Sequence, residues 1–354
     1  MSASPHKGRG AVSRRDGRFT TRPVEFEDEE AARRDAMAPE TVLRAMQAGS
    51  IISHNRSPDV PFDRSINPYQ GCEHGCIYCY ARPSHSYLDL SPGLDFETRI
   101  FYKPNAASRL LEAWEKPGYA CKPITIGANT DPYQPAEKST QVTRQLLELF
   151  VEHSHPVNLI TKGSLITRDI DLLARLAQRG LCSVAISLPT LNDELKRVME
   201  PRVPSAEARL KAIRQLTMNG IPTSVLMAPL IPAINDAEIE SVLEAVAEAG
   251  ASHAHYIFLR LPHEVGALFT EWLEAHFPDR ATHVMSLVRQ ASGGRDYDNR
   301  FGVRQKGRGA YADMLGKRFR AACRRHGLAL DRYQQSLDCG QFVKPGQQQL
   351  GLDL

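Results

Sequence analysis

The sequence predicts an α/β fold built around a parallel sheet. Short apolar runs that are typical of strands alternate along the chain with longer segments whose apolar residues recur at helical spacing. Four of the five expected helices begin at residues that favour helix caps, three end at glycines, and no internal repeat is found. Strands joined through helices form parallel sheets with right-handed crossovers, which either curl into a barrel or stay open. In both arrangements the chemistry takes place at the C-terminal ends of the strands.

Six strands and five helices are expected in this alternating part of the chain. The strands are residues 62–67, 124–127, 157–160, 183–187, 223–227 and 255–259. The helices are residues 105–114, 141–152, 167–180, 205–220 and 235–250. Asn105, Thr167 and Ser205 are expected to cap three of these helices. Asn235, with Glu238 three residues later, forms a capping-box pattern at the last one.

The two ends of the chain lack this alternation. Residues 1–38 are polar without a sustained period, which predicts a disordered arm, and a short helix is expected at 40–48. After residue 265 the pattern predicts a helical region with a glycine break at 293–294, and then a polar tail. The expected organisation is therefore an arm (1–38), a core (39–265), a basic helical region (266–330) and a tail (331–354).

Composition excludes two classes of protein. The chain has 354 residues, of which 42% are hydrophobic and 24% charged, so one large or two smaller domains would fit. No run approaches the roughly 18 apolar residues of a membrane helix, and the N-terminus has no apolar signal core. Seven cysteines at irregular spacing argue against a disulfide scaffold. A cytoplasmic protein with reduced thiols and no membrane association is expected.

The charge distribution is uneven although the net charge is only +3. Residues 1–23 carry a net +5 and residues 289–325 a net +8, so the remainder carries −10. Basic ends on an acidic body indicate contact with a polyanion such as nucleic acid. For the C-terminal block, solubility and compensation of helix ends are an equally good interpretation.

The strongest chemical signal is three cysteines at C-x3-C-x2-C spacing, Cys72, Cys76 and Cys79. Three thiolates within eight residues can surround one soft metal centre, either zinc or an iron–sulfur cluster. Three ligands leave one coordination position open, as in catalytic centres. The alternative is a structural zinc site completed by His74 or by a distant cysteine.

The spacing, with the aromatic Tyr78 before the third cysteine, resembles the radical S-adenosylmethionine (radical SAM) superfamily. The resemblance implies a partial (β/α)6 TIM-like barrel with a helical C-terminal extension. It also implies a 4Fe–4S cluster on the three cysteines, whose unique iron binds SAM. Reductive cleavage of SAM then yields a 5′-deoxyadenosyl radical that abstracts hydrogen. An electron donor such as flavodoxin or ferredoxin is implied as a partner.

Residues 66–261 more closely resemble spore photoproduct lyase and its relatives, through several short segments in the same order. The resemblance implies SAM contacts from residues at the strand ends. These are Tyr78 in the cluster loop, the hydroxyls of Thr130 and Ser187, the Lys162 amine on the carboxylate, and the Ala228 backbone at adenine.

One departure from that family concerns the residue before Thr130. The lyase has a cysteine hydrogen donor there, whereas this chain has Asn129. Reversal of thymine dimers through that thiol is therefore not expected, and the chain is similar to the broader group of spore-photolyase-like proteins. Further candidates for catalysis or substrate binding are Asp131 and Tyr133 on the same loop, Arg202, and His263 beyond the sixth strand. For Arg202 a surface ion pair is an equally good interpretation.

The last six residues resemble the peptide by which bacterial DNA polymerases and repair proteins bind the sliding clamp. The matching positions are Gln349, Leu350, Leu352 and Leu354. An extended peptide with alternating apolar anchors can enter a preformed groove. The alternative is that the three leucines dock the tail on its own domain.

Two classes of function follow. The first is a radical SAM enzyme whose substrate is a nucleic-acid base, in DNA repair or modification, or otherwise a protein or small molecule. The second is a non-catalytic, DNA-associated adaptor stabilised by zinc or by an inert cluster at the three cysteines.

Overall fold

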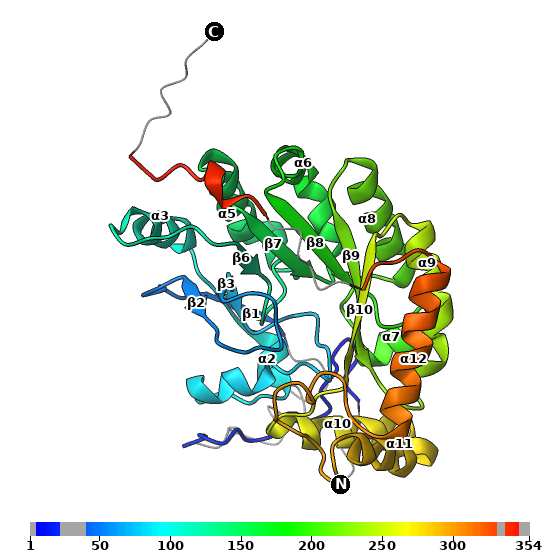
Figure 1. The fold of residues 1–354 in the computed structure, drawn as a ribbon. Coiled ribbons are helices and arrows are strands. Elements are labelled where there is room, and N and C mark those ends of the chain that lie inside the picture. The colour runs from blue at the N-terminus through cyan, green and yellow to red at the C-terminus, as the bar shows by residue number, and fades with distance from the viewer. Residues whose placement is uncertain (1–4, 22–39, 331–336, 347–354) are drawn as a thin grey trace.

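A curved sheet of seven strands forms the centre of the molecule (Figure 1). The computed structural model describes residues 5–21, 40–330 and 337–346. The strand order is β10-β9-β8-β7-β6-β3-β2, and every neighbouring pair is parallel except β2 with β3. The strands are β2 (Ile52–His54), β3 (Arg64–Ile66), β6 (Ile124–Ile126), β7 (Val157–Thr161), β8 (Cys182–Ser187), β9 (Thr223–Leu230) and β10 (His253–Phe258).

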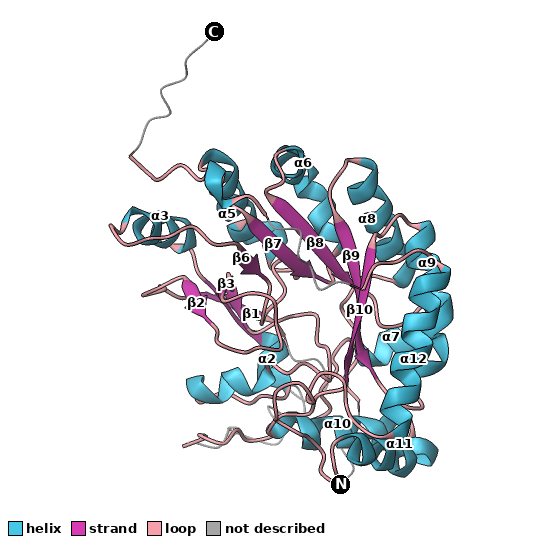
Figure 2. Ribbon diagram, viewed as in Figure 1, coloured by secondary structure: helices cyan, strands magenta, loops and turns pink. Residues whose placement is uncertain are grey.

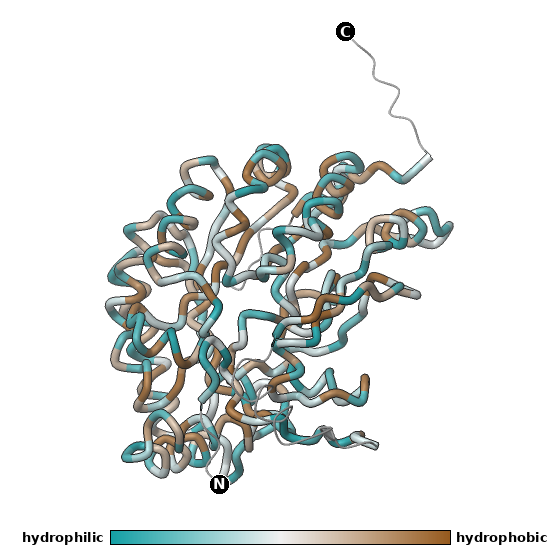
Figure 3. Tube along the Cα trace, turned by 180° about the vertical axis from the view of Figure 1, so that it is seen from behind, coloured by the Kyte–Doolittle hydropathy of each residue, from teal (hydrophilic) through white to brown (hydrophobic). Residues whose placement is uncertain are grey.

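Helices connect the parallel strands and cover the outside of the curved sheet (Figure 2). They are α3 (Ala106–Glu115), α4 (Glu137–Thr140), α5 (Val142–Glu152), α6 (Ile170–Gln178), α7 (Asp193–Met199), α8 (Ala206–Met218) and α9 (Ile239–Glu248). Polar and apolar residues alternate along these helices (Figure 3), and the apolar faces pack on the strands. The α/β fold with six parallel strands in a partial barrel is therefore confirmed.

A second, smaller sheet has the order β1-β5-β4. Its strands are β1 (Val42–Ala45), β4 (Tyr69–Gln70) and β5 (Arg99–Tyr102), with the short helix α2 (Leu94–Thr98) before β5. The helix predicted at 40–48 is wrong, because this segment pairs in parallel with β5 as β1. Pairing with a strand that lies more than fifty residues away outweighs local helix propensity here.

Three of the four predicted helix caps make no capping hydrogen bond. The side chains of Asn105 and Asn235 serve tertiary contacts instead, since Asn105 accepts from the Ala48 backbone N–H at 2.9 Å, and the Thr167 hydroxyl donates locally to the Ser164 carbonyl. The Asn235 amide donates to the carbonyls of Pro189 and Pro229 at 2.8 and 2.9 Å, so it joins the loop after β8 to the end of β9. Thr167 lies within a 3₁₀ helix (Ser164–Asp169) rather than at the start of α6. Ser205 caps α8 as predicted, accepting a hydrogen bond from the backbone N–H of Ala208 at 3.2 Å.

The C-terminal region is helical as predicted, with α10 (Glu264–His276), α11 (Pro278–Ala291) and α12 (Ala310–Arg325). Helices α10 and α11 lie together at one end of the molecule, whereas α12 packs along α9 (Figure 1). The break at 293–294 lies in the loop between α11 and α12. No helix in the described ranges is long and apolar enough to cross a membrane.

Candidate active site: the cysteine loop and its cavity

The three cysteines lie in the loop that follows β4, at the C-terminal ends of the barrel strands. Cys72 and Cys76 are buried, and Cys79 is half-buried. All three thiols line one cavity of about 200 Å³. In the metal-free chain, burial raises the pKa of Cys76 to about 12, although nearby Lys162 favours the thiolate.

Two glycines allow the loop to turn within a crowded space. Gly71 and Gly75 have φ of +82° and +67°. A Cβ at Gly71 would lie 2.9 Å from the His85 ring, and one at Gly75 would lie 2.7 Å from a Glu97 carboxylate oxygen. Any other residue at these positions would both strain the backbone and displace the loop.

A fully buried arginine holds the loop from behind. Arg82 follows the loop in the 3₁₀ helix η1 (Arg82–Leu88). Its guanidinium donates to the carbonyls of Cys76 at 2.9 Å and Gly75 at 3.2 Å. The charge is balanced by Glu97, which is also fully buried and lies 2.5 Å away.

The N-terminal arm completes this support, so the prediction of disorder is wrong for residues 5–21. The backbone N–H groups of Gly10 and Ala11 donate to the two oxygens of Glu97 at 3.0 and 2.8 Å. Gly10 is packed so closely on the cysteine loop that a Cβ would lie 1.9 Å from the Gly75 carbonyl oxygen. Partners far away in the chain order this polar segment, which residue composition alone cannot reveal.

Tyr78 anchors the inner side of the loop to a buried ion pair. Its hydroxyl donates to one oxygen of Glu200, whose other oxygen accepts from Arg209 at 2.9 Å. Both charged residues are fully buried. The Lys162 amine lies 5.8 Å from the centre of the Tyr78 ring. Burial lowers the pKa of Lys162, but Cys76 and the neighbouring carboxylates outweigh it, so the amine stays protonated.

Asp131 connects the cysteine loop to the end of β7. Its carboxylate accepts from the Thr161 hydroxyl and the Lys162 backbone N–H, both at 2.6 Å. It also accepts from the Tyr133 backbone N–H at 2.9 Å and lies 3.3 Å from His74 Nδ1. Burial raises the pKa of Asp131, but His74 and these hydrogen bonds prevail and lower it to about 2. The carboxylate therefore fixes the backbone that carries Lys162.

The cavity brings together most of the residues predicted to contact SAM. Its lining includes Tyr78, Lys162, Ser187 and Ala228, as well as two substrate candidates, Asn129 and Asp131. The Ser187 hydroxyl lies 3.2 Å from the carbonyl oxygen of Ala228, so these two residues of neighbouring strands meet at the cavity wall.

Four other candidates do not line this cavity. The Thr130 hydroxyl is buried and donates to the Tyr69 carbonyl at 2.8 Å. Tyr133 is buried in the core, and Arg202 pairs with Glu73 at 2.8 Å. His263 is exposed at the start of α10. The clamp-like positions Gln349, Leu350, Leu352 and Leu354 lie outside the described residues.

Sequence reasoning missed three residues at the cavity, Tyr80, Arg260 and Gln305. The Arg260 guanidinium lies 5.0 Å from the centre of the Tyr80 ring and donates to the Tyr297 hydroxyl at 3.3 Å. The position of Arg260 just beyond β10 is a signal that would have found it. Gln305 has no such signal, because it comes from the irregular loop between α11 and α12.

The residues present fit an iron–sulfur cluster better than the zinc alternative. Thiolates are the usual ligands of such clusters, and this cavity holds three thiols beside a protonated amine. His74 faces Asp131 rather than completing a thiolate set. Over the described ranges, no three His, Cys, Asp or Glu side chains converge on a point suited to a single metal ion.

Comparison with known proteins shows the family to which this chain belongs. Residues 66–246 match the family model of the radical SAM superfamily. An uncharacterised protein of Mycobacterium tuberculosis is 34% identical over 261 residues, covering 70% of this chain and 77% of the relative. The radical SAM Nα-GlyT isomerase of Pseudomonas phage M6 is 27% identical over 231 residues, covering 64% of this chain and 46% of the relative.

Solved structures of spore photoproduct lyase have a similar fold. One mutant superposes with a TM-score of 0.60 at 16% identity, covering 89% of this chain and 88% of the other. The complex with dinucleoside spore photoproduct also gives a TM-score of 0.60 at 16% identity, with 88% and 86% covered. The matched family segment spans the cysteine loop and strands β4 to β9. The chain is thus an enzyme of the radical SAM superfamily, whose cofactors are a 4Fe–4S cluster and SAM.

Proposed function

We propose that this enzyme abstracts hydrogen from a base of a nucleic acid. In this proposal Cys72, Cys76 and Cys79 hold the 4Fe–4S cluster. When bound, the cluster supplies the electron that cleaves SAM reductively to the 5′-deoxyadenosyl radical. The superfamily needs a reductant for this step, and we propose flavodoxin or ferredoxin as the donor.

The residues of this chain would bind and orient SAM at the wall of the cysteine cavity. The Lys162 amine is the cation for its carboxylate, and Asp131 holds the backbone of that lysine in place. Ser187 offers a hydroxyl to the ribose, and the Ala228 backbone meets the adenine. Tyr78 closes the inner side of the site through its bond to Glu200. Thr130 is left out, because its hydroxyl is bonded elsewhere.

The choice of a nucleic acid rests on one observation, a row of unpaired cations on α12. Lys317, Arg320 and Arg324 occupy positions i, i+3 and i+7, so they share one face over about 10 Å. All three are exposed, and none pairs with an acid in the described part of the chain. Arg318, by contrast, points to Glu240 at 2.6 Å. An unbalanced basic row of this length suits successive phosphates.

The likeness to spore photoproduct lyase adds support, because the same fold holds a dinucleoside in that protein's complex. The reaction differs from that of the lyase in this proposal. Asn129 lines the cavity at the position where the resemblance places a hydrogen-donating cysteine. The enzyme therefore does not return hydrogen through a thiol at this position.

The first test is 5′-deoxyadenosine formation by anaerobically reconstituted, dithionite-reduced enzyme. The assay is run with single-stranded DNA, duplex DNA and RNA, and at least one of them is expected to stimulate 5′-deoxyadenosine formation. The Cys76→Ala variant should form no 5′-deoxyadenosine. Stimulation by peptides or small molecules with no response to any nucleic acid would overturn the proposal. It would leave the alternative of a protein or small-molecule substrate.

The second test addresses the basic row directly. Reversal of all three charges (Lys317→Glu, Arg320→Glu and Arg324→Glu) should weaken oligonucleotide binding. The slope of log binding constant against log salt concentration should become less steep by about two to three. The matched control reverses Lys138, Arg175 and Lys211, which are exposed on α4, α6 and α8. Equal losses in both triple variants would show only a non-specific charge effect and would contradict this assignment.

Binding of the C-terminal peptide to a sliding clamp is a separate proposal that rests on the sequence alone. A synthetic peptide of residues 345–354 should bind a bacterial clamp, and replacement of Leu352 and Leu354 by alanine should abolish binding. Failure of the unsubstituted peptide to bind would remove this partner without affecting the catalytic proposal.

A further inference from the structure

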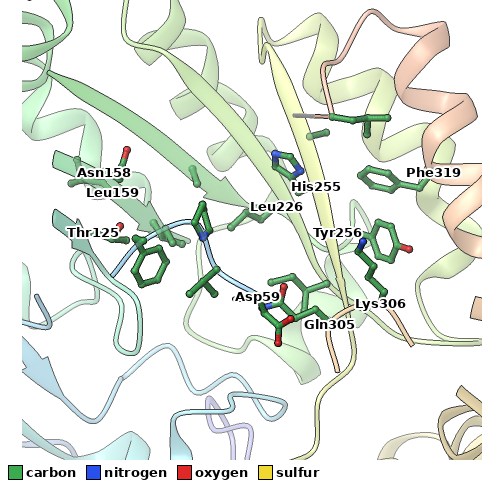
Figure 4. A pocket seen from close by; sticks show the side chains of 18 of the residues that line it. Asp59, Thr125, Asn158, Leu159, Leu226, His255, Tyr256, Gln305, Lys306 and Phe319 are labelled. Carbon is green, nitrogen blue, oxygen red and sulfur yellow. The ribbon is translucent and has the colours of Figure 1, made fainter. Parts of the chain in front are cut away.

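A second cavity of about 330 Å³ lies inside the barrel beside the cysteine cavity (Figure 4). Its volume lies at the lower end of the range for small-molecule sites. Thr125 and Asn158 lie on one side, and His255, Tyr256 and Lys306 on the other. We call this cavity the chamber.

The chamber exists because the side chains that project inward on one side of the barrel are polar and small. Ser65 of β3, Thr125 of β6, Asn158 of β7 and Ser183 of β8 are direct partners across neighbouring parallel strands. Partners in this register project from the same face of the sheet. Parallel strands covered on both faces are normally rich in Val, Ile and Leu, so a polar row inside the barrel needs another explanation.

Three polar groups of the chamber lack partners within the described structure. Thr125 is 1% exposed, and its buried hydroxyl makes no hydrogen bond. Asn158 accepts from the Ser183 hydroxyl at 2.6 Å, which leaves its NH2 group without an acceptor. Gln305 is 8% exposed, and its side-chain amide bonds to no described residue. Of these three groups only the Thr125 hydroxyl is fully shielded from solvent, and Asn158 is half-buried. Because buried polar groups normally find partners, this hydroxyl and the two amides that line the same chamber indicate a ligand site.

The remaining lining is mostly apolar, with Asp59, His255, Tyr256 and two cations as its polar members. Ala185, Leu226 and Phe319 supply apolar surface against which a flat ring can lie. Lys306 and Arg320 line the same chamber with exposed side chains, and neither pairs with an acid among the described residues. The Asp59 carboxylate that also lines the chamber is paired with Arg304 at 2.5 Å. The chamber thus offers neutral hydrogen-bonding groups inside, one carboxylate that is already paired, and two cations that pair with no acid among the described residues.

The chamber and the cysteine cavity share part of their lining. The shared residues are Val60, Phe62, Ile160, Leu226, Ile257 and Gln305. A group held in the chamber would therefore lie next to the cavity in which SAM is expected to bind. This adjacency is what hydrogen abstraction from a bound substrate requires.

We propose that the chamber binds one nucleotide of the substrate, its base against Thr125, Asn158 and Gln305 and its phosphate at Lys306 and Arg320. The inference rests on the proposed function and specifies its recognition site. A neutral base is planar and carries both donors and acceptors on its edge, which matches a hydroxyl and two amides. Arg320 belongs both to the rim and to the basic row on α12, so the two surfaces are continuous.

The decisive variant is Thr125→Val, which removes a hydroxyl without changing the side-chain volume much. Because this hydroxyl has no partner among the described residues, the melting temperature should not fall, while nucleotide affinity should fall about 3- to 10-fold. Gln305→Leu should behave in the same way. Thr143→Val is the matched control, because the buried Thr143 hydroxyl donates to the Pro132 carbonyl at 2.7 Å. It should lower the melting temperature and leave affinity unchanged.

Binding is measured anaerobically with SAM present, using the four deoxynucleoside 5′-monophosphates, the matching nucleosides and a single-stranded oligonucleotide. Lys306→Gln should lower the affinity for the monophosphates and leave the affinity for the nucleosides unchanged. Binding of monophosphates that is sensitive to Thr125→Val supports a free nucleotide in the chamber. If only the oligonucleotide binds, and Thr125→Val weakens that binding, the chamber takes up a base that belongs to a nucleic-acid strand.

Three results would overturn the inference. They are unchanged affinity in both Thr125→Val and Gln305→Leu, a lowered melting temperature of Thr125→Val, and equal effects of Lys306→Gln on nucleosides and monophosphates. If affinity is unchanged in both Thr125→Val and Gln305→Leu but the oligonucleotide still binds through the α12 row, the proposed function stands. Only the assignment of the chamber as a nucleotide site is then overturned. If no nucleotide or nucleic acid binds the unsubstituted enzyme, the proposed function itself fails.

Discussion

At the scale of single residues, Glu200 shows how burial and pairing are balanced around the cysteine cavity. Its carboxylate is shared between the Tyr78 hydroxyl and the Arg209 guanidinium, and Arg209 also donates to the Ser187 carbonyl at 3.0 Å. The buried pair thus joins the cysteine loop to the end of β8, where the SAM-facing hydroxyl lies. A buried ion pair of this kind contributes little net stability, and its main effect is to position these groups.

Glu200→Ala should lower the free energy of unfolding by about 3 to 5 kcal/mol, because it leaves the Arg209 charge buried without a partner. Urea denaturation of the metal-free protein measures this change. Glu207→Ala is the control, because Glu207 pairs with Arg214 on the surface, and it should cost less than about 1 kcal/mol. Similar costs for both variants would mean that Arg209 finds water or another partner.

His155 is the residue for which a pH dependence is expected. It stacks on Trp114 at 4.8 Å and contacts the Tyr119 hydroxyl at 2.7 Å through Nε2. Burial lowers the pKa of His155 to about 3. Below its unfolded pKa of about 6.5 the unfolded chain takes up the proton and the folded chain does not. The stabilising contribution of His155 to the free energy of unfolding is therefore complete above about pH 6.5 and is lost as the pH falls toward 3.

Between pH 7 and pH 5 the unsubstituted protein should lose about 2 kcal/mol more unfolding free energy than His155→Phe. The comparison is made by denaturant titration at both pH values, so that contributions from other groups cancel. Identical pH dependence of the two proteins would show that the His155 ring titrates in the folded state as it does in water.

At the scale of elements, the N-terminal arm and the cysteine loop form one unit although the chain separates them by more than sixty residues. Arg9 donates to the Glu97 carbonyl at 3.0 Å, and the next two residues donate to the Glu97 carboxylate. The arm therefore occupies the space behind the loop that Arg82 also supports.

Gly10→Ala should move the arm away from the loop, because its Cβ would meet the Gly75 carbonyl oxygen at 1.9 Å. We expect a loss of about 1 to 3 kcal/mol in unfolding free energy, together with less iron retained per chain after reconstitution. Gly49→Ala is the control, since a Cβ there meets nothing within 4 Å. Normal iron content in Gly10→Ala would show that the loop keeps its shape without the arm.

At the scale of the whole molecule, the C-terminal region closes the side of the partial barrel between β10 and β2. Asp59, in the loop between β2 and β3, pairs with Arg304 and accepts from the Gly302 backbone N–H at 2.6 Å. The backbone N–H of Phe258 in β10 donates to the Gln305 carbonyl at 2.8 Å. The loop before α12 thus bridges the two edges of the sheet and carries Gln305 and Lys306 into the chamber wall.

Arg304→Ala should release this closure at a cost of about 2 kcal/mol, because a charged hydrogen-bonded pair is lost. Hydrogen exchange should increase in residues 57–62 and 300–306 while β7 and β8 stay protected. Lys122→Ala breaks the exposed pair with Asp63 at the end of the same loop and should leave exchange unchanged. Protection that persists in Arg304→Ala would assign the closure to backbone contacts alone.

Sequence and structure agree wherever the signal is local. Strands β6 to β10 and helices α3, α5, α6, α8 and α9 lie where apolar periodicity predicts them, because a strand or helix repeat is a property of consecutive residues, whereas α7 was not predicted. The cysteine spacing predicts one centre, and the structure places all three thiols in one cavity. Lys162, Ser187 and Ala228 meet there because parallel strands end at the same edge of the barrel.

The sequence by itself therefore determined the fold class, the cysteine centre and its strand-end neighbours. Only the tertiary structure decided which polar groups find partners: Gly10 bonds to Glu97 across 87 residues and Asn235 to Pro189 across 46, whereas the Thr125 hydroxyl bonds to no described residue. Hydrogen-bond partners far apart in the chain depend on how complete elements pack, and no pattern of neighbouring residues encodes that packing. The ordered arm, the strand at β1 and the chamber beside the cysteine cavity all follow from it.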